Sequence, residues 1–167
     1  RVGFNRRFSP FLIRMRECFT ADEPRVFNCR VNVGSLSGHW SMSAGEGGRL
    51  IGEGVHFFDL CNWFMKASPT QIQTSRIGEN APENPNAVVS MTYSDGSVAT
   101  VTYATVGHEG LGKERYEAFG NGQSACCDDF HSLKLMGRKV GRRTRGKYDK
   151  GHNGILQEFV EAITGDV

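Results

Sequence analysis

The stretch AVVSMTYSDGSVATVTYATVG, residues 87–107, decides the kind of sheet that this sequence forms. Two runs rich in β-branched and aromatic residues flank the segment Ser94 to Ser97, and the Asp95-Gly96 pair within it favours a tight hairpin turn. The pattern therefore predicts two antiparallel strands joined by a short turn.

Other predicted strands and helices lie on both sides of this hairpin. Residues 25–35 alternate apolar and polar side chains, the period of a half-buried strand, which places Arg30 and Asn32 on one face. Further strands are predicted over residues 71–77, 114–121 and 124–136. Helices are predicted over residues 11–19, 54–65 and 151–167. Successive strands joined by turns indicate an α+β fold, a largely antiparallel β-sheet with helices on one face.

Length and composition favour one domain over residues 1–167. With 167 residues and 38% hydrophobic content, the chain is long enough to bury a core. A net charge of +2 is too small to indicate nucleic acid or an anionic membrane as the main partner. The sequence has neither a membrane-spanning apolar run nor a signal peptide, so we expect a cytoplasmic protein. Because the chain begins with Arg1 rather than Met, we also expect a fragment of a longer protein.

The five cysteines are odd in number and show no CxxC spacing, which argues against a disulfide framework and a zinc knuckle. We expect free thiols or small core residues. A basic segment, residues 137–152, carries seven Lys or Arg against one Asp. Tyr148 is its one aromatic residue for base stacking, so a solvated loop is favoured over a nucleic-acid or phosphate patch. Contact with an anionic cofactor or substrate from a neighbouring domain is a further alternative.

The segment GEGGRLIGEGVHFFD, residues 45–59, is rich in glycine but fits no nucleotide-binding loop. Gly47 and Gly52 have the P-loop spacing, but Glu53 follows where that motif needs Lys. The dinucleotide fingerprint GxGxxG fails there as well. The glycines are therefore interpreted as a conformationally permissive entry to the helix that follows.

Glu53, His56 and Asp59 are spaced by three and occupy one sector of the predicted helix. A carboxylate beside His56 would fix the tautomer of the imidazole and favour its protonated form, giving a proton acceptor tuned near neutral pH. A purely structural helix start, with Glu53 near the helix dipole and His56 paired with Asp59, fits the spacing equally well. A metal site through Glu-x-x-His is a third alternative, although di-metal sites need two such pairs.

Several segments, in order along nearly the whole chain, together resemble the Gfo/Idh/MocA family, the glucose-fructose oxidoreductases and inositol dehydrogenases. The matching segments are VGFNRRFSP, RVNVGSLSGHW, GGRLIGEGVHFFDL, YSDGSVATVTY, GKERYEAFGN, DDF and DKGH...EFVEAI.G. The resemblance implies the C-terminal α+β substrate domain alone. The N-terminal Rossmann domain and the Glu-Lys-Pro motif with its catalytic Lys would lie upstream of Arg1.

The resemblance also implies roles for individual residues. His56 corresponds to the active-site His that exchanges a proton with the substrate hydroxyl, and Asp59 fits the family's His-x-x-Asp pattern. Many members carry Asp four positions before this His, where this chain has Gly52.

The resemblance implies further site residues. Asn5 and Arg6 are expected near the cofactor. The expected substrate-binding residues are Arg7, His39, Trp40, Glu53 and Asp59. His39 and Trp40 fit a packed loop equally well. Lys113, with the two residues that follow it, is interpreted as an ordinary strand-end charge cluster.

These observations predict the substrate-binding and oligomerisation domain of an NAD(P)-dependent dehydrogenase that oxidises a sugar, nucleotide sugar or cyclitol. NAD or NADP would be bound in the full-length enzyme and not by this chain alone, which should be inactive. The expected partners are the upstream Rossmann domain, a sugar-like substrate and further copies of the chain through the sheet. The alternatives are a non-catalytic sugar-binding, dimerisation or regulatory domain of the same fold, and an unrelated binding domain.

Overall fold

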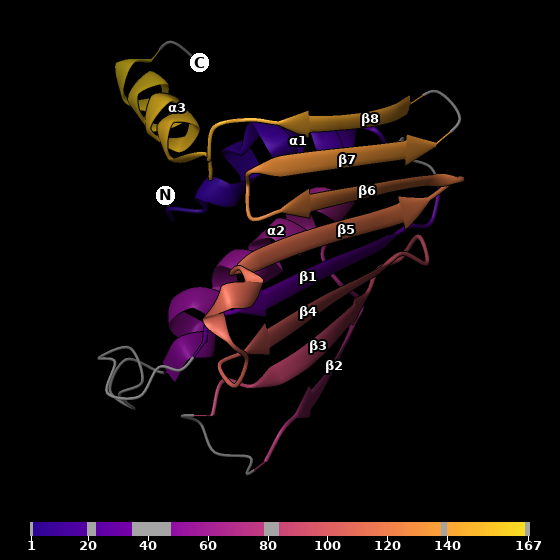
Figure 1. The fold of residues 1–167 in the computed structure, drawn as a ribbon. Coiled ribbons are helices and arrows are strands. Elements are labelled where there is room, and N and C mark those ends of the chain that lie inside the picture. Colours follow the sequence, from indigo (N-terminus) through magenta and orange to yellow (C-terminus); the bar gives the residue numbers. More distant parts are fainter. Residues whose placement is uncertain (1, 20–22, 35–47, 79–83, 138–139, 166–167) are drawn as a thin grey trace.

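The computed structural model describes residues 2–19, 23–34, 48–78, 84–137 and 140–165, and it is built around one eight-stranded sheet (Figure 1). The strand order across the sheet is β2-β3-β4-β1-β5-β6-β7-β8. The strands are β1 (Val26–Asn32), β2 (Gln71–Arg76), β3 (Ala87–Thr92), β4 (Val98–Ala104), β5 (Glu114–Gly120), β6 (Gln123–Asp128), β7 (Ser132–Gly137) and β8 (Val140–Arg145). Every neighbouring pair is antiparallel except β1 and β4, which run parallel. The largely antiparallel sheet is thus confirmed.

The hairpin predicted over residues 87–107 is formed by β3 and β4. Its turn is held by Asp95, whose carboxylate accepts hydrogen bonds from the backbone N–H and the hydroxyl of Ser97, both at 2.9 Å. Gly96 takes the positive φ of +83° that the turn needs. Ser97 Oγ in turn accepts the backbone N–H of Arg25 at 3.0 Å, so the turn also fixes the start of β1.

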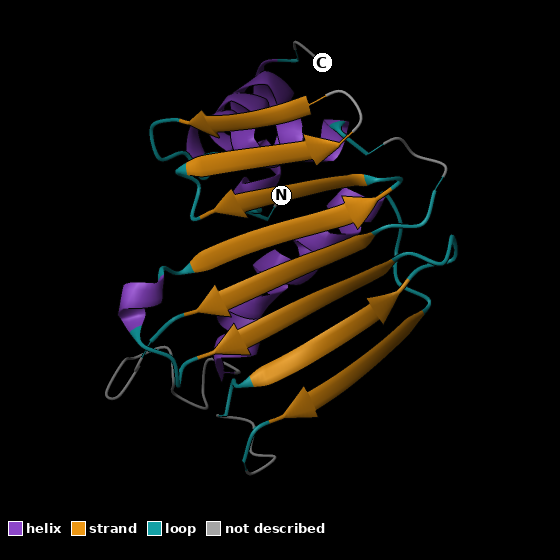
Figure 2. Cartoon of the chain, turned by 45° about the vertical axis from the view of Figure 1, so that its right-hand side comes forward, coloured by secondary structure: helices purple, strands orange, loops and turns teal. Residues whose placement is uncertain are grey.

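The helices α1 (Pro10–Glu17) and α2 (Val55–Met65) cover one face of the sheet and leave the other face open (Figure 2). The core between them is aromatic: the rings of Phe27 on β1 and Phe64 on α2 stack with centroids 4.1 Å apart. Phe27 also stacks on Tyr116 of β5. The predicted α+β fold with helices on one face is therefore correct. No helix in the described ranges is long and apolar enough to cross a membrane.

All five cysteines are free thiols, and Cys29, Cys61 and Cys127 are buried, as the odd count and spacing predicted. The Sγ atoms of Cys29 on β1 and Cys61 on α2 lie 3.7 Å apart in the core. These thiols act as small packing groups between sheet and helix.

One prediction was wrong: the basic segment is not simply a solvated loop. Its residues 140–145 form β8, the edge strand that pairs with β7 in the register Gly137↔Val140 to Ser132↔Arg145. An edge strand is held by backbone hydrogen bonds along one side only and commonly carries charged residues. A charge-rich sequence is therefore compatible with a strand at this place, and the absence of an apolar alternation concealed it.

The final helix, α3 (His152–Thr164), projects beyond the sheet beside the N-terminal segment (Figure 1). Its connection is fixed to the short helix η1 (Asn5–Phe8). Ser9 Oγ donates to the carbonyl of Asp149 at 2.8 Å, and Asn5 Nδ2 donates to the carbonyl of Lys150 at 2.9 Å. These bonds place the residues before α3 against the start of the chain.

Gly151 makes this connection possible. Its φ is +85°, and a Cβ atom at this position would lie 2.4 Å from the carbonyl oxygen of Asn5 and 2.5 Å from the backbone N of Ser9. Both atoms belong to backbone and cannot move aside without shifting η1. Only glycine satisfies the conformation and the close approach together.

Gly151→Ala should therefore lower the free energy of unfolding by about 2 kcal/mol or more, from the left-handed conformation and the backbone clash combined. Gly122→Ala is the matched control, because Gly122 also has a positive φ, +67°, but nothing lies within 4 Å of an added Cβ. Urea unfolding of both variants measures the difference. Equal losses in the two variants would show that the contact with η1 is not important.

Candidate functional site

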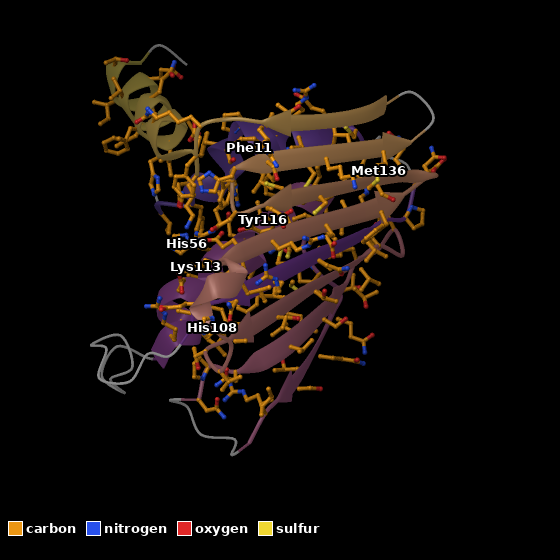
Figure 3. The ribbon with its side chains drawn as sticks, in the orientation of Figure 1. Phe11, His56, His108, Lys113, Tyr116 and Met136 are labelled. Atoms are coloured by element: carbon orange, nitrogen blue, oxygen red, sulfur yellow. The ribbon has the colours of Figure 1, made fainter. Side chains whose placement is uncertain are left out.

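A polar cleft lies where η1, the start of α2 and the segment before α3 come together. Its volume is about 400 Å³, and its lining residues are Asn5, Arg6, Arg49, Gly52, Glu53, His56, Tyr148, Lys150 and His152. Figure 3 shows His56 and Lys113 at the same end of the sheet. The structure thus gathers Asn5, Arg6, Glu53 and His56, four of the predicted site residues, from distant parts of the sequence.

His56 lies in the first turn of α2, and the edge of its ring packs against Phe4 with centroids 5.5 Å apart. Its Nδ1 atom is buried and has no hydrogen-bond partner within the described part of the chain. Burial and the positive charge of Arg6 lower the pKa of His56, and the carboxylates of Glu53, Asp59 and Glu114 only partly oppose them. The imidazole is therefore neutral at neutral pH and able to accept a proton.

The expectation that a carboxylate orients His56 was wrong, because Glu53 is bound elsewhere. Its Oε1 accepts a hydrogen bond from Lys113 Nζ at 2.6 Å, and its Oε2 accepts one from the Tyr103 hydroxyl at 2.5 Å. Arg49 Nη2 also lies 2.8 Å from Oε2. Burial would raise the pKa of Glu53, but these contacts outweigh burial and lower it.

A local departure from α-helical geometry explains the difference. Residues Leu50–Gly54 form a π-helical turn, η4, before α2 begins at Val55. The three-residue spacing places side chains in one sector only on a continuous α-helix. Glu53 and His56 lie on either side of the change in geometry, and Glu53 instead binds Tyr103 on β4 and Lys113, the residue before β5. Gly52 adds no side chain, and nothing lies within 4 Å of where its Cβ would be.

Asp59 does not contact His56 either. Both oxygens of this carboxylate accept hydrogen bonds from Arg7, one of them from Nε at 2.6 Å. Arg7 and Asp59 therefore form a bidentate pair that joins η1 to α2. This places the two predicted substrate-binding residues next to the cleft but outside its lining.

Arg6 is almost fully buried and binds Glu114 at the start of β5. Its Nε and Nη2 atoms donate to the two carboxylate oxygens at 2.9 and 2.8 Å, and its guanidinium stacks on Phe57 at 4.4 Å. Lys150 Nζ lies 2.7 Å from the same carboxylate, and the hydroxyl of Tyr116 donates to it.

Burial would raise the pKa of Glu114, but Arg6 and Lys150 bring it down to about 2. Its stabilising contribution is therefore present above the usual carboxyl pKa of 4.5 and is lost as the pH falls towards 2.

Asn5, the other residue predicted near the cofactor, is buried, and its side-chain Nδ2 donates a hydrogen bond to the Lys150 carbonyl. His39 and Trp40 lie outside the described residues. No group of three metal-ligating side chains lies close together in the described ranges.

Sequence reasoning missed Glu114 and Lys150. Glu114 was interpreted as part of an ordinary strand-end charge cluster, yet it is 1% exposed. Its position was readable from the sequence, because Glu114, Tyr116 and Ala118 alternate onto the buried face of one strand. Lys150 carried no such signal, since it lies in a loop between β8 and α3.

Comparison with known proteins places this geometry in a family. Residues 21–125 match the family described as the GFO/IDH/MocA C-terminal domain. No match is found among curated proteins.

Among solved structures, UDP-N-acetylglucosamine 3-dehydrogenase GnnA from Acidithiobacillus ferrooxidans is similar, with 18% identity and a TM-score of 0.74 over 99% of this chain and 52% of that one. The dehydrogenase MviM from Clostridium difficile is 15% identical, with a TM-score of 0.73 over 99% of this chain and 54% of that one. A super-repressor mutant of Gal80p from Saccharomyces cerevisiae is 11% identical, with a TM-score of 0.72 over 98% of this chain and 52% of that one.

At these identities the similarity shows the fold, and the chain spans about half the length of each of these proteins. The family match covers more than half of the chain, and its range includes the hairpin, β1, α2 and β5. The sequence segments, the sheet topology and the family match agree, and the chain belongs to the GFO/IDH/MocA C-terminal domain family.

Proposed function

We propose that this chain is the substrate-binding part of an NAD(P)-dependent dehydrogenase that oxidises a hydroxyl group of a sugar, nucleotide sugar or cyclitol. The observation that carries the proposal is His56, an imidazole kept neutral by burial and by Arg6 at the wall of a polar cleft. A general base must be unprotonated at the working pH and within reach of the proton that it removes.

In this proposal His56 takes the hydroxyl proton of the substrate. Since Nδ1 is buried, Nε2 is the nitrogen that serves as acceptor. The Phe4 ring limits the rotation of the imidazole, and Arg6 disfavours its protonated form, so the neutral imidazole is available to accept the substrate proton. NAD or NADP, held mainly by an upstream Rossmann domain, would accept the hydride. Asn5 and Arg6 shape the cleft wall on the proposed cofactor side.

The helix α3 supports the presence of that upstream domain. Phe159 and Ile163 lie four residues apart on its apolar side and are 48% and 67% exposed. A groove of about 420 Å³ runs between this helix and the N-terminal segment. The similar structures are about twice as long as this chain. We therefore assign this groove to the upstream domain.

The open face of the sheet supports self-association. It carries apolar side chains, among them Phe119 and Met136, each 41% exposed. Charges of both signs accompany them, such as Arg115 with Asp128 at 2.8 Å. A face with both signs of charge can complement a second copy of itself, so we propose a homo-oligomer through the sheet. The proposed location is the cytoplasm.

A non-catalytic sugar-binding or regulatory role is the second candidate. Gly52 lacks the carboxylate that the family resemblance implies, and Glu53 does not replace it. The similarity to the super-repressor mutant of Gal80p shows that the fold occurs in that protein as well. Kinetics of the full-length protein distinguish the two candidates.

His56→Ala in the full-length enzyme should lower kcat by roughly 10² to 10⁴, the usual contribution of a positioned general base. His108→Asn is the control, because His108 is exposed and its ring accepts the Gly110 N–H outside the cleft. NAD(P) reduction with a panel of sugars and cyclitols measures both variants. Unchanged turnover in His56→Ala would remove His56 from the mechanism.

The dependence of kcat/KM on pH should report the lowered pKa of His56. Activity requires the neutral imidazole, so the rate should stay constant at neutral pH and fall only below the usual histidine pKa of about 6.5. An acid limb with an apparent pKa above about 7 would contradict this assignment. The limb should disappear in His56→Ala.

The 167-residue chain alone should show no measurable affinity for NAD or NADP, because it lacks a dinucleotide fingerprint. Isothermal titration of each nucleotide into the chain tests this expectation, with the full-length enzyme as the positive control. Tight binding by the chain alone would overturn the division of roles between the two domains.

A further inference from the structure

The cleft that contains His56 carries more positive charge than its carboxylates neutralise. Glu114 is one carboxylate, yet it contacts two cations, Arg6 at 2.8 and 2.9 Å and Lys150 at 2.7 Å. In the part of the chain that the structure describes, Asp149 makes no ion pair with Lys150, and its Oδ1 accepts the Gly151 N–H at 2.7 Å. The cluster of Arg6, Lys150 and Glu114 therefore carries one net positive charge.

The two cations differ in how they are held. Arg6 spans both oxygens of Glu114 with two N–H donors, and its side chain is 7% exposed. Lys150 makes a single contact with one of those oxygens, and its side chain is 14% exposed at the cleft. Since the bidentate Arg6 pair is complete, Lys150 provides the surplus charge.

The surroundings of Lys150 keep its ammonium group charged and in place. Burial would lower its pKa, but Glu114 raises it above the usual lysine range. The ammonium also lies 5.6 Å from the centre of the Phe130 ring and 5.9 Å from that of Tyr148. A lysine with three N–H donors and one carboxylate contact has donors left for a ligand.

The second carboxylate of the cleft does not supply the missing negative charge. Glu53 is already bound by Lys113 Nζ at 2.6 Å, by Arg49 Nη2 at 2.8 Å and by the Tyr103 hydroxyl, and these contacts lower its pKa. A hollow of about 290 Å³ adjoins the cleft and shares Tyr148, Lys150 and His152 with it. Space for a substituent therefore continues past Lys150.

We propose that the substrate carries an anionic group, a carboxylate or a phosphate, which binds Lys150 while the reacting hydroxyl lies at His56. The inference rests on the proposed function, and it names the class of substrate: a sugar acid, a sugar phosphate or a nucleotide sugar rather than a neutral sugar. A partly buried cluster in which two cations share one carboxylate carries a net positive charge, which is costly, and an anionic ligand removes this cost on binding.

The test compares matched ligands with the full-length enzyme, by titration calorimetry without nucleotide and by kcat/KM with NAD(P). The panel contains glucose, glucuronate, glucose 6-phosphate and UDP-glucose, with the corresponding galactose and N-acetylglucosamine series. At least one anionic member should bind about tenfold more tightly than its neutral counterpart, or more, as expected for a charged hydrogen bond. The carboxylate and phosphate members show which anion is recognised.

Lys150→Met should abolish this preference, because it keeps the aliphatic stem and removes the charge. Lys150→Arg should retain it. Lys134→Met, on the open face of the sheet, is the control for the loss of one positive charge. Thermal unfolding of each variant establishes whether the fold is intact. If Lys150→Met does not fold, the ligand panel measured with the unsubstituted enzyme and with Lys150→Arg tests the inference.

Three results would overturn the inference: neutral members that bind as tightly as anionic ones, no binding by any anionic member, or a Lys150→Met variant in which only the KM for NAD(P) changes. Failure of the proposed function looks different. If the protein binds anionic sugars through Lys150 but never reduces NAD(P), the anionic-substrate inference stands and the proposed dehydrogenase activity is wrong. If neutral and anionic sugars are oxidised at equal rates, the dehydrogenase activity stands and the anionic-substrate inference is wrong.

Discussion

The buried carboxylate of Glu114 is the interaction on which the rest of the structure depends. It joins η1 through Arg6 and the segment before α3 through Lys150 to the centre of the sheet at β5. A buried carboxylate is tolerated only when its hydrogen bonds are satisfied, and here two cations and a tyrosine hydroxyl satisfy it. The segments that contain Arg6 and Lys150 are therefore both held by the Glu114 carboxylate, and the cleft is formed where these segments come together.

The same network sets the chemistry of the cleft. Arg6 neutralises Glu114 in the interior and also acts on His56 from a distance, because its charge disfavours a second cation nearby. Burial and the Arg6 guanidinium, rather than a carboxylate partner, thus keep the imidazole neutral. This differs from the arrangement in which a carboxylate raises the basicity of a histidine.

Much of the fold was predictable because its signals are local. The Asp95-Gly96 turn predicted the β3–β4 hairpin, and alternation predicted β1 and its buried face. The edge strand β8 was missed because its pairing is decided by the neighbouring β7 and not by its own composition. Within the site, spacing found His56, but the π-helical turn before it changed which side chains share a sector. Lys150 is placed by the backbone fit around Gly151, which no short pattern in the sequence encodes.

The central position of β1 has a consequence for how the chain reaches this fold. This strand comes early in the sequence, but its partners are β4, about seventy residues later, and β5, later still. The local hairpins β3–β4 and β5–β6 can form on their own, while β1 must close long loops before it gains any pairing. During synthesis both edges of β1 therefore stay unpaired until β4 and β5 have also left the ribosome. The aromatic face around Phe27 is completed only then.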